Sequence, residues 1–367
     1  MDTRELFRIL VRGGGSDLVI KAGGCPAMRV QGRIKFVSES RVPDAFAEAL
    51  AQQVVPEKLR AKFERSGEVD CSHVVEDVGR FRANLFRQQG KLTLVFRHVA
   101  EQVPSMEELN LPAKQLKALA ALQRGLVLVT GTTGSGKSTT LASMVEYMNH
   151  HFARHIITIE DPIEYVFVDR KSLINQREVG FDTDNYTQAL RHVVRQTPDV
   201  ILLGEMRDAE TVEAALAAAE TGHLVLSTLH TVNAVQSVER ILGFFEPHHH
   251  AQLRLQLSLV LEGVISQRLL PRKNDQTRVP AVEILLATPT VRDLLYEGKT
   301  RELTKAIYEG AHYYGTQTFQ QSLVNLYRET LITYDDALAA SDNPDELKLE
   351  LRGITKGSAA GDFNFKY

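Results

Sequence analysis

A glycine-rich loop follows a short apolar run near the middle of the chain. The stretch from Gly131 to Ser138 matches G-x-x-x-x-G-K-[ST] at every fixed position, directly after "LVLVT". In such a loop the glycines let backbone N–H groups face an anion. The lysine supplies positive charge for the β- and γ-phosphates, and the serine hydroxyl binds Mg²⁺. The sequence therefore predicts ATP and Mg²⁺ as cofactors. The residues expected to hold them are Gly131, Thr132, Thr133, Gly134, Ser135, Gly136, Lys137, Ser138 and Thr139.

Acidic residues end two further segments that are expected to be strands. "HIITIE" ends at Glu160, with Asp161 and Glu164 close behind, and "DVILLGE" ends at Glu205. Because ligands bind at the carboxyl ends of strands in an open α/β sheet, both groups should arrive near the loop. One carboxylate must activate the attacking water, and another must help to hold Mg²⁺. We favour Glu160 over Glu164 as the base because Glu160 directly ends the strand, although either could merely cap the next segment. Glu205 joins Ser138 as the predicted metal ligand.

Two histidines flank a fourth apolar segment, "LVLST". His223 precedes this segment and His230 follows it. We expect both to lie at the same edge of the sheet, beside the nucleotide, where a histidine can sense the γ-phosphate by hydrogen bonding. The alternative for each is a histidine whose hydrogen bonds are satisfied within the core.

The overall composition limits the class of protein. The 367 residues, 43% of them hydrophobic, allow two or three domains. No run of 18 apolar residues and no signal-peptide core occur, so no transmembrane segment is expected. Cys25 and Cys71 are the two cysteines, which fits a reducing cytoplasm and excludes a disulfide framework. A net charge of −3 does not mark a dedicated nucleic-acid binder, and no nucleic-acid partner is predicted.

The pattern along the chain predicts an α/β protein with two domains. Residues 1–101 show a helix followed by strand-like segments at 17–23, 26–37, 69–76 and 79–99, typical of a small α+β domain. Residues 102–122 are expected to form a linker and a connecting helix. Residues 123–356 alternate strands and helices, as in a doubly wound, mostly parallel sheet, with a purely helical pattern from about 247 that includes 251–270. Residues 357–367 are expected to be a flexible tail.

Several motifs, taken in order, resemble those of a known family. The loop above is followed by "IEDPIEY", "VILLGEMRD" and "GHLVLSTLHT", the order found in the secretion-superfamily (GspE/PilT) traffic ATPases. "GRFRANLFRQ", "NQREVGFDTDNYTQALRHVVRQ" and "VISQRLLP" are more closely similar to the type IV pilus retraction ATPases of the PilT/PilU kind. The resemblance runs from Leu6 to about Leu351. It implies a PAS-like N-terminal domain, a RecA-like P-loop NTPase domain with a helical C-terminal extension, and a homohexameric ring.

The resemblance also implies roles for particular residues. Glu160, Glu205, Lys137 and His230 fall on the family's catalytic positions, and His223 falls on its second histidine position. Arginines of the N-terminal domain close on the phosphates in this family. The matching residues here are Arg80, Arg82 and Arg97, each of which could otherwise be an ordinary surface arginine on an edge strand.

The implied function is a hexameric motor that hydrolyses ATP to retract type IV pili in twitching motility. Such a motor is cytoplasmic and lies at the inner face of the cytoplasmic membrane, in contact with the pilus platform protein and, where one is present, with a paralogous retraction ATPase. The family's late "AIRNLIRE"-like segment reads "TVRDLLYEGK" here, so Arg292 is retained but Tyr296 replaces the second arginine. The main motor and an accessory paralogue therefore both remain open.

Two other functions compete with this interpretation. A pilus assembly or type II secretion ATPase of the same superfamily would have a longer N-terminal region and a four-cysteine zinc loop. About 120 residues precede the ATPase domain here, and the chain has two cysteines. A RecA-like nucleic-acid motor would need a basic channel and stacking aromatic residues.

Overall fold

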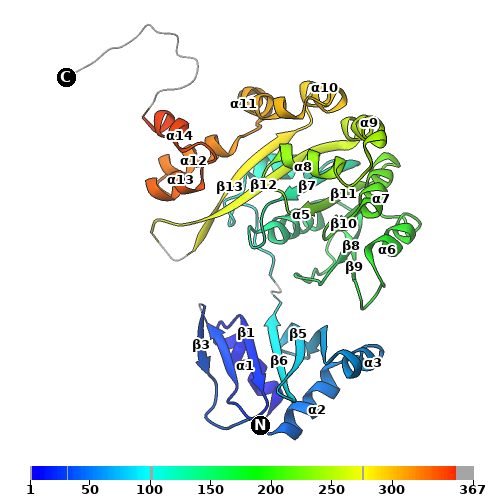
Figure 1. Cartoon of the computed structure of the whole chain (residues 1–367), viewed down its shortest axis with the longest axis vertical. Coiled ribbons are helices and arrows are strands. Elements are labelled where there is room, and N and C mark those ends of the chain that lie inside the picture. The colour runs from blue at the N-terminus through cyan, green and yellow to red at the C-terminus, as the bar shows by residue number, and fades with distance from the viewer. Residues whose placement is uncertain (1, 31, 100–101, 275–276, 353–367) are drawn as a thin grey trace, which may run out of the picture. The chain divides into compact units, whose positions relative to one another are not determined.

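The computed structural model describes residues 2–30, 32–99, 102–274 and 277–352 (Figure 1). Their contacts divide the chain into two compact units. The first contains Met1–Val103, Asp161–Phe167 and Glu178–Asp182, and the second contains Pro104–Glu160, Val168–Arg177 and Thr183–Tyr367. The predicted boundary at 101 is thus close to the observed one. The predicted linker and its helix, however, belong to the second unit, and two stretches expected in the ATPase domain belong to the first. The predicted tail, 357–367, lies outside the described residues.

The first unit is an antiparallel sheet with helices packed on it. Its strands are ordered β3-β2-β1-β6-β5-β4. The strands are β1 (Asp17–Lys21), β2 (Ala27–Val30), β3 (Arg33–Phe36), β4 (Glu68–Val75), β5 (Gly79–Gln88) and β6 (Lys91–His98), and the helices are α1 (Thr3–Arg12), α2 (Asp44–Val54) and α3 (Glu57–Ser66). In β5 and β6 inward-facing residues alternate with outward-facing ones, and Phe81 and Phe96 are fully buried in the core. Phe7 of α1 packs against both rings, at 4.5 Å and 4.8 Å between centroids.

The second unit is built on a seven-stranded sheet ordered β13-β12-β7-β11-β10-β8-β9. The four strands in the middle, β7, β11, β10 and β8, run parallel. Every residue of β7 and β11 is buried, as expected of strands covered on both faces. The predicted parallel α/β sheet is therefore confirmed. The strands are β7 (Gly125–Thr130), β8 (His155–Glu160), β9 (Leu173–Glu178), β10 (Val200–Leu203), β11 (Leu224–Leu229), β12 (Leu261–Pro271) and β13 (Arg278–Leu286).

Helices connect and follow these strands. They are α4 (Ala113–Ala120), α5 (Lys137–His151), α6 (Tyr186–Val193), α7 (Ala209–Glu220), α8 (Ala234–Leu242), α9 (His250–Val260), α10 (Pro289–Glu297), α11 (Leu303–Tyr314), α12 (Phe319–Arg328), α13 (Tyr334–Ala340) and α14 (Pro344–Leu351), with short 3₁₀ turns at η1 (Pro247–His249) and η2 (Thr300–Glu302). Figure 1 shows α12, α13 and α14 gathered beside the β12–β13 hairpin, where Phe319, Leu323 and Leu347 share a core with Leu270 and Val279 of the hairpin. Among the described residues, no helix is long and apolar enough to cross a membrane.

The helical pattern expected over 251–270 is confirmed for its first half and wrong for its second half. The helix α9 ends at Val260, and the chain continues as β12, which pairs with β7 on one side and with β13 on the other. The apolar period cannot separate the two states here, because a strand buried on both faces is apolar throughout. Gly263 in β12 allows the close approach of neighbouring residues. A Cβ atom there would lie 3.0 Å from Leu119 and 3.2 Å from the Leu285 carbonyl, a spacing that only glycine accommodates without displacing its neighbours.

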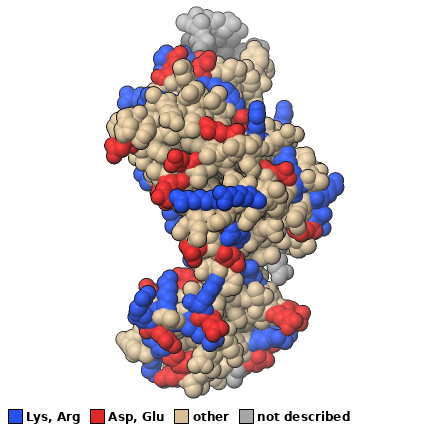
Figure 2. All heavy atoms as spheres, turned by 90° about the vertical axis from the view of Figure 1, so that its right-hand side faces the viewer, with Lys and Arg blue, Asp and Glu red and all other residues tan. Residues whose placement is uncertain are grey.

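Charge is mixed on one face of the molecule. Figure 2 shows Lys and Arg interspersed with Asp and Glu on the face drawn, in keeping with the small net charge of −3. On this face the described residues do not form the basic stripe that a nucleic-acid motor requires.

Candidate nucleotide-binding site

The loop after β7 has the backbone that phosphate binding requires. Gly131, Gly134 and Gly136 have φ angles of 146°, 78° and 92°, which residues with a side chain rarely adopt. A Cβ atom on Gly131 would lie 2.4 Å from the Ser135 hydroxyl and 2.6 Å from the Gln267 carbonyl. The helix α5 then begins at Lys137, with Gly136 at its N-cap. The N–H groups of its first turn are therefore available to an anion, with the positive end of the helix dipole behind them.

The polar side chains of the loop complete this cradle. Lys137 is 8% exposed, and its ammonium donates to the carbonyls of Gly131 (2.8 Å) and Thr132 (3.0 Å). The buried Ser135 hydroxyl has no hydrogen-bond partner within the described parts of the chain. Such a hydroxyl is costly unless a ligand pairs with it. The glycine backbone, the held lysine and the unpaired hydroxyl together fit the phosphates of a nucleotide.

The predicted carboxylates reach the edge of the sheet where this loop lies, which we call the carboxyl edge. Adjacent parallel strands end together here: Ile159 is in register with Leu203, Leu203 with Ser227, and Leu229 with Thr130. Glu160 ends β8, and Glu205 follows β10 by two residues. The expectation that both arrive at the edge carrying the loop is confirmed.

Glu205 contacts two basic residues at this edge, Arg207 and His230. One carboxylate oxygen accepts from Arg207 Nε at 2.8 Å, and the other lies 3.2 Å from His230 Nε2. His230 follows Leu229, whose partner in β7 is Thr130, so its position at the carboxyl edge is confirmed. Sequence reasoning missed Arg207, although it lies within the quoted motif "VILLGEMRD".

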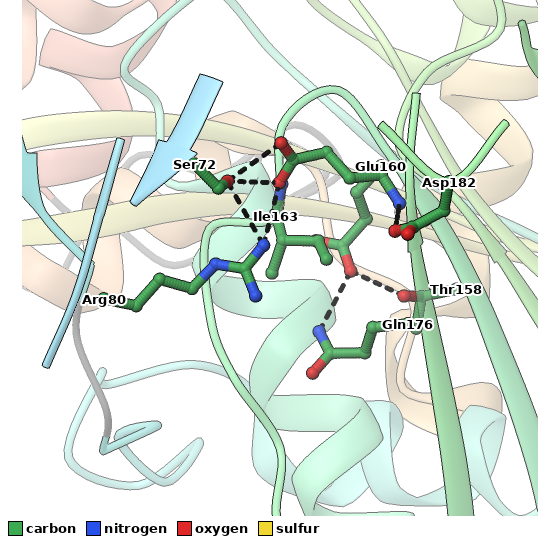
Figure 3. Close-up of polar contacts among 8 residues, drawn as sticks. Ser72, Arg80, Thr158, Glu160, Ile163, Gln176 and Asp182 are labelled. Carbon is green, nitrogen blue, oxygen red and sulfur yellow. Dashed lines mark hydrogen bonds and ion pairs between the residues drawn. The ribbon is translucent and has the colours of Figure 1, made fainter. Parts of the chain in front are cut away.

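Glu160 accepts hydrogen bonds from two neutral groups of neighbouring side chains. Its Oε1 atom accepts from the Thr158 hydroxyl at 2.6 Å and from Gln176 Nε2 at 3.3 Å (Figure 3). Sequence reasoning missed both residues. Gln176 lies in β9, a strand that the pattern did not predict, and no motif marks it as a partner of Glu160.

Comparisons with known proteins identify the family of this chain. The family described as "Type II/IV secretion system protein" matches residues 76–330. The chain is 42% identical to "Type IV pilus ATPase PilU" of Pseudomonas aeruginosa, over 96% of this chain and 92% of that one. The chain belongs to the type II/IV secretion system protein family, in its PilT/PilU-like branch.

Two further relatives support the same assignment. "Type IV pilus retractation ATPase PilT" of Pseudomonas aeruginosa is also 42% identical, over 94% of this chain and 99% of that one. The solved structure "Crystal Structure of the Pilus Retraction Motor PilT and Bound ADP" matches with a TM-score of 0.88 and 46% identity, covering 95% of this chain and 99% of that one. This chain thus shares the two-domain traffic ATPase fold.

One predicted site residue of this PilT/PilU-like chain lies at the wrong edge. The expectation that His223 and His230 share an edge is wrong, because they flank opposite ends of one strand. The His223 carbonyl accepts from the N–H of Gly125, at the start of β7, whereas the loop begins after its end. The His223 ring instead contacts the Ala218 carbonyl at 2.9 Å. Direct contact between His223 and phosphates held by its own loop is therefore excluded.

The two candidate bases belong to different units. Glu160 is the last residue of its segment in the second unit, and Glu164 is an exposed residue in the Asp161–Phe167 segment of the first. Glu160 is thus the candidate that shares a unit with the loop, with Lys137 and with Glu205.

The three predicted arginines each face a carboxylate within the first unit. Arg97 Nε lies 2.9 Å from Asp17, and Arg82 Nη2 lies 3.7 Å from Asp70. Arg82 and Arg97 are directly opposite each other on β5 and β6, and like charges in this position are unfavourable. Their side chains are 43% and 66% exposed, so an anion can reach this pair.

Arg80 is held more firmly than the other two. Its Nη2 donates to Glu178 at 3.1 Å and to the Ser72 hydroxyl at 3.2 Å. Glu178 is 4% exposed, and it also accepts from Ser72 and from the N–H of Ile163 (Figure 3). Sequence reasoning missed Glu178, although it lies in the quoted motif "NQREVG". The burial of this pair marks Arg80 as the least available of the three arginines.

Proposed function

We propose that this chain is an ATPase motor that drives retraction of type IV pili in twitching motility. The observation that carries the proposal is the meeting of the phosphate loop, Glu160, Glu205 and His230 at one sheet edge. The chain that carries them is similar over nearly its whole length to a pilus ATPase and a pilus retraction ATPase. The chain is 42% identical both to PilU and to PilT. This supports assignment to the retraction motors, but it does not distinguish the main motor from an accessory paralogue.

The residues of the carboxyl edge divide the work of hydrolysis. Lys137 exchanges its loop carbonyls for the β- and γ-phosphate oxygens of ATP, and the loop N–H groups bind the same oxygens. Glu160 orients the attacking water and accepts its proton as the water oxygen bonds to the γ-phosphorus. ADP then leaves with the electron pair of the broken bond.

The metal site is proposed to involve Ser138 and Glu205. Bound Mg²⁺ supplies positive charge to the β- and γ-phosphate oxygens. The half-buried hydroxyl of Ser138 lies in the first turn of α5, and Glu205 presents a carboxylate at the same edge. Because Glu205 contacts Arg207 and His230, these two side chains also orient it. His230 then lies within reach of the γ-phosphate region, as the sequence predicted.

The N-terminal arginines are proposed to add charge when the units close on ATP. Arg82 exchanges the exposed Asp70 for the γ-phosphate, whereas Arg97 must leave the buried Asp17 and Arg80 the buried Glu178 to do the same. We infer that the working unit is a homohexameric ring. It is cytoplasmic, and it lies against the inner-membrane platform protein of the pilus and a paralogous ATPase.

Deletion of the gene, scored for surface pili and twitching, tests the direction of force. We expect more surface pili and lost twitching if the chain is the main motor. An accessory motor would leave unloaded retraction normal but weaken pulling under load. Loss of surface pili on deletion would contradict retraction and would favour the assembly ATPase.

A further inference from the structure

We infer that Gln176, together with Thr158, is a positioning residue that sets the direction of the Glu160 carboxylate for attack by water. This inference rests on the proposed role of Glu160 as the base. It adds to that role two residues to which the sequence assigned no function, one of them in a strand that the sequence pattern did not predict.

The geometry places both donors on one carboxylate oxygen. The Thr158 hydroxyl (2.6 Å) and Gln176 Nε2 (3.3 Å) both donate to Glu160 Oε1 (Figure 3). Thr158 precedes Glu160 by two residues in β8, so the two side chains lie on the same face of the strand. Gln176 approaches from β9, the neighbouring strand. The carboxylate is thus held by its own strand and by the next one.

Such a clamp matters because the base ends a strand. A glutamate side chain has three rotatable bonds, and ordering it costs conformational entropy. Two hydrogen bonds to the ionised carboxylate offset this cost and favour one orientation. With Oε1 held, Oε2 points in a defined direction. A base that is oriented before the reaction spends less time misaligned with the attacking water, so the reaction is faster.

The chemical type of the donors suits a base. An amide and a hydroxyl donate hydrogen bonds without carrying charge, so they orient the carboxylate while leaving its negative charge in place. A lysine or arginine in the same position would stabilise the ionised form much more strongly and weaken it as a proton acceptor.

The test removes one donor at a time from the full chain. Gln176→Met keeps the length of the side chain and removes its N–H groups. Thr158→Val keeps the branched shape of a fully buried side chain and removes the hydroxyl, whereas Thr158→Ser retains it. Asn175→Ala is the matched control on β9, because the Asn175 side chain contacts His155 at 2.8 Å and not Glu160.

We expect kcat to fall about tenfold in Gln176→Met and in Thr158→Val. This is a part of the rate enhancement of roughly 10²- to 10⁴-fold that a positioned general base contributes. The affinity for a non-hydrolysable ATP analogue and the melting temperature should change little, since no phosphate contact is removed. Thr158→Ser and Asn175→Ala should hydrolyse ATP at close to the wild-type rate. A fall in kcat accompanied by equal losses of affinity and melting temperature would overturn the inference in favour of a purely structural role.

A parallel measurement on Glu160→Gln separates this inference from the proposed function. If Glu160→Gln is inactive while Gln176→Met and Thr158→Val retain wild-type kcat, Glu160 remains the base and the inference is wrong. If Glu160→Gln itself hydrolyses ATP normally, the assignment of the base fails, and the inference fails with it.

Discussion

At the scale of single residues, the site depends on partners that hold its groups before ATP arrives. Lys137 is buried and donates to two loop carbonyls, and Glu205 lies between Arg207 and His230. These bonds orient the side chains and are exchanged for bonds to the nucleotide. A group ordered in this way loses less conformational entropy on binding.

Replacement of the loop lysine tests this organisation. Lys137→Ala should lower ATP turnover by about 10³-fold or more, because the phosphates lose their nearest mobile charge. The fold should persist, since the lysine contributes hydrogen bonds to the loop and no apolar packing to the core. Phosphate release and thermal melting measure the two effects. Lys305→Ala, on an exposed side chain of α11, is the control, and turnover near wild type in Lys137→Ala would refute the phosphate-loop assignment.

A buried acid away from the site predicts a dependence of stability on pH. Burial raises the pKa of Glu283 from 4.5 to about 7, against the opposing effects of the Ala234 N–H and the Arg268 charge. Between these two values the folded chain keeps a proton that the unfolded chain has lost. The free energy of unfolding therefore falls as pH rises from about 4.5 to about 7, and this contribution is constant above that range.

Glu283→Gln should remove this dependence, because the amide oxygen still accepts from Ala234 and carries no charge. The stability of the variant relative to wild type should rise between pH 5 and pH 7.5 by on the order of 3 kcal/mol. Denaturant unfolding across this range measures the difference. Parallel curves for the two proteins would show that Glu283 does not titrate in this window.

At the scale of elements, the turn from β7 to α5 and the strand β9 determine the site. The turn needs glycine for two different reasons. At Gly131 a side chain would collide with Ser135 and Gln267. At Gly134 the φ angle alone, 78°, disfavours other residues, because no described neighbour comes within 4 Å of the place a Cβ atom would take. Strand β9 contributes Gln176, which donates a hydrogen bond to Glu160. Two residues later it contributes Glu178, which accepts a hydrogen bond from Arg80.

These two glycines allow a matched comparison. Gly134→Ala bears a backbone cost of about 1–2 kcal/mol and should weaken ATP binding by up to about 30-fold. Gly131→Ala has the same kind of cost and an additional collision with a backbone carbonyl, so its ATP affinity should fall by at least a further tenfold. Titration with a fluorescent ATP analogue measures both. Equal losses in the two variants would show that the collision is relieved by movement of the loop.

At the scale of the whole molecule, hydrolysis is expected to require the first unit and a ring of chains. The second unit supplies the loop, Glu160, Glu205 and His230, whereas Arg82 and Arg97 belong to the first unit. The two arginines face each other across β5 and β6, a repulsive arrangement that an anion would relieve. Each arginine contributed to the transition state by another domain or chain is worth about 10³–10⁵ in rate.

Arg82→Ala with Arg97→Ala should therefore reduce turnover by about 10³-fold while ATP binding persists. Arg87→Ala, on the same strand but paired with Glu48, is the matched control and should be close to wild type. Light scattering in the presence of ATP should give the mass of six chains of 41.0 kDa each. Full activity from the double variant, or from a protein that stays monomeric with ATP, would contradict the ring mechanism.

The sequence by itself determined the phosphate loop, the strand-ending Glu160 and Glu205, His230 and the α/β class, because each depends on local pattern and on the shared direction of parallel strands. Tertiary structure alone decided that 261–271 is a strand, that His223 lies at the far edge, and that Gln176 and Glu178 bind Glu160 and Arg80. These features depend on which strands become neighbours and in what register. A strand buried on both faces has no distinctive period, and a hydrogen bond between strands brings together residues that no local motif connects.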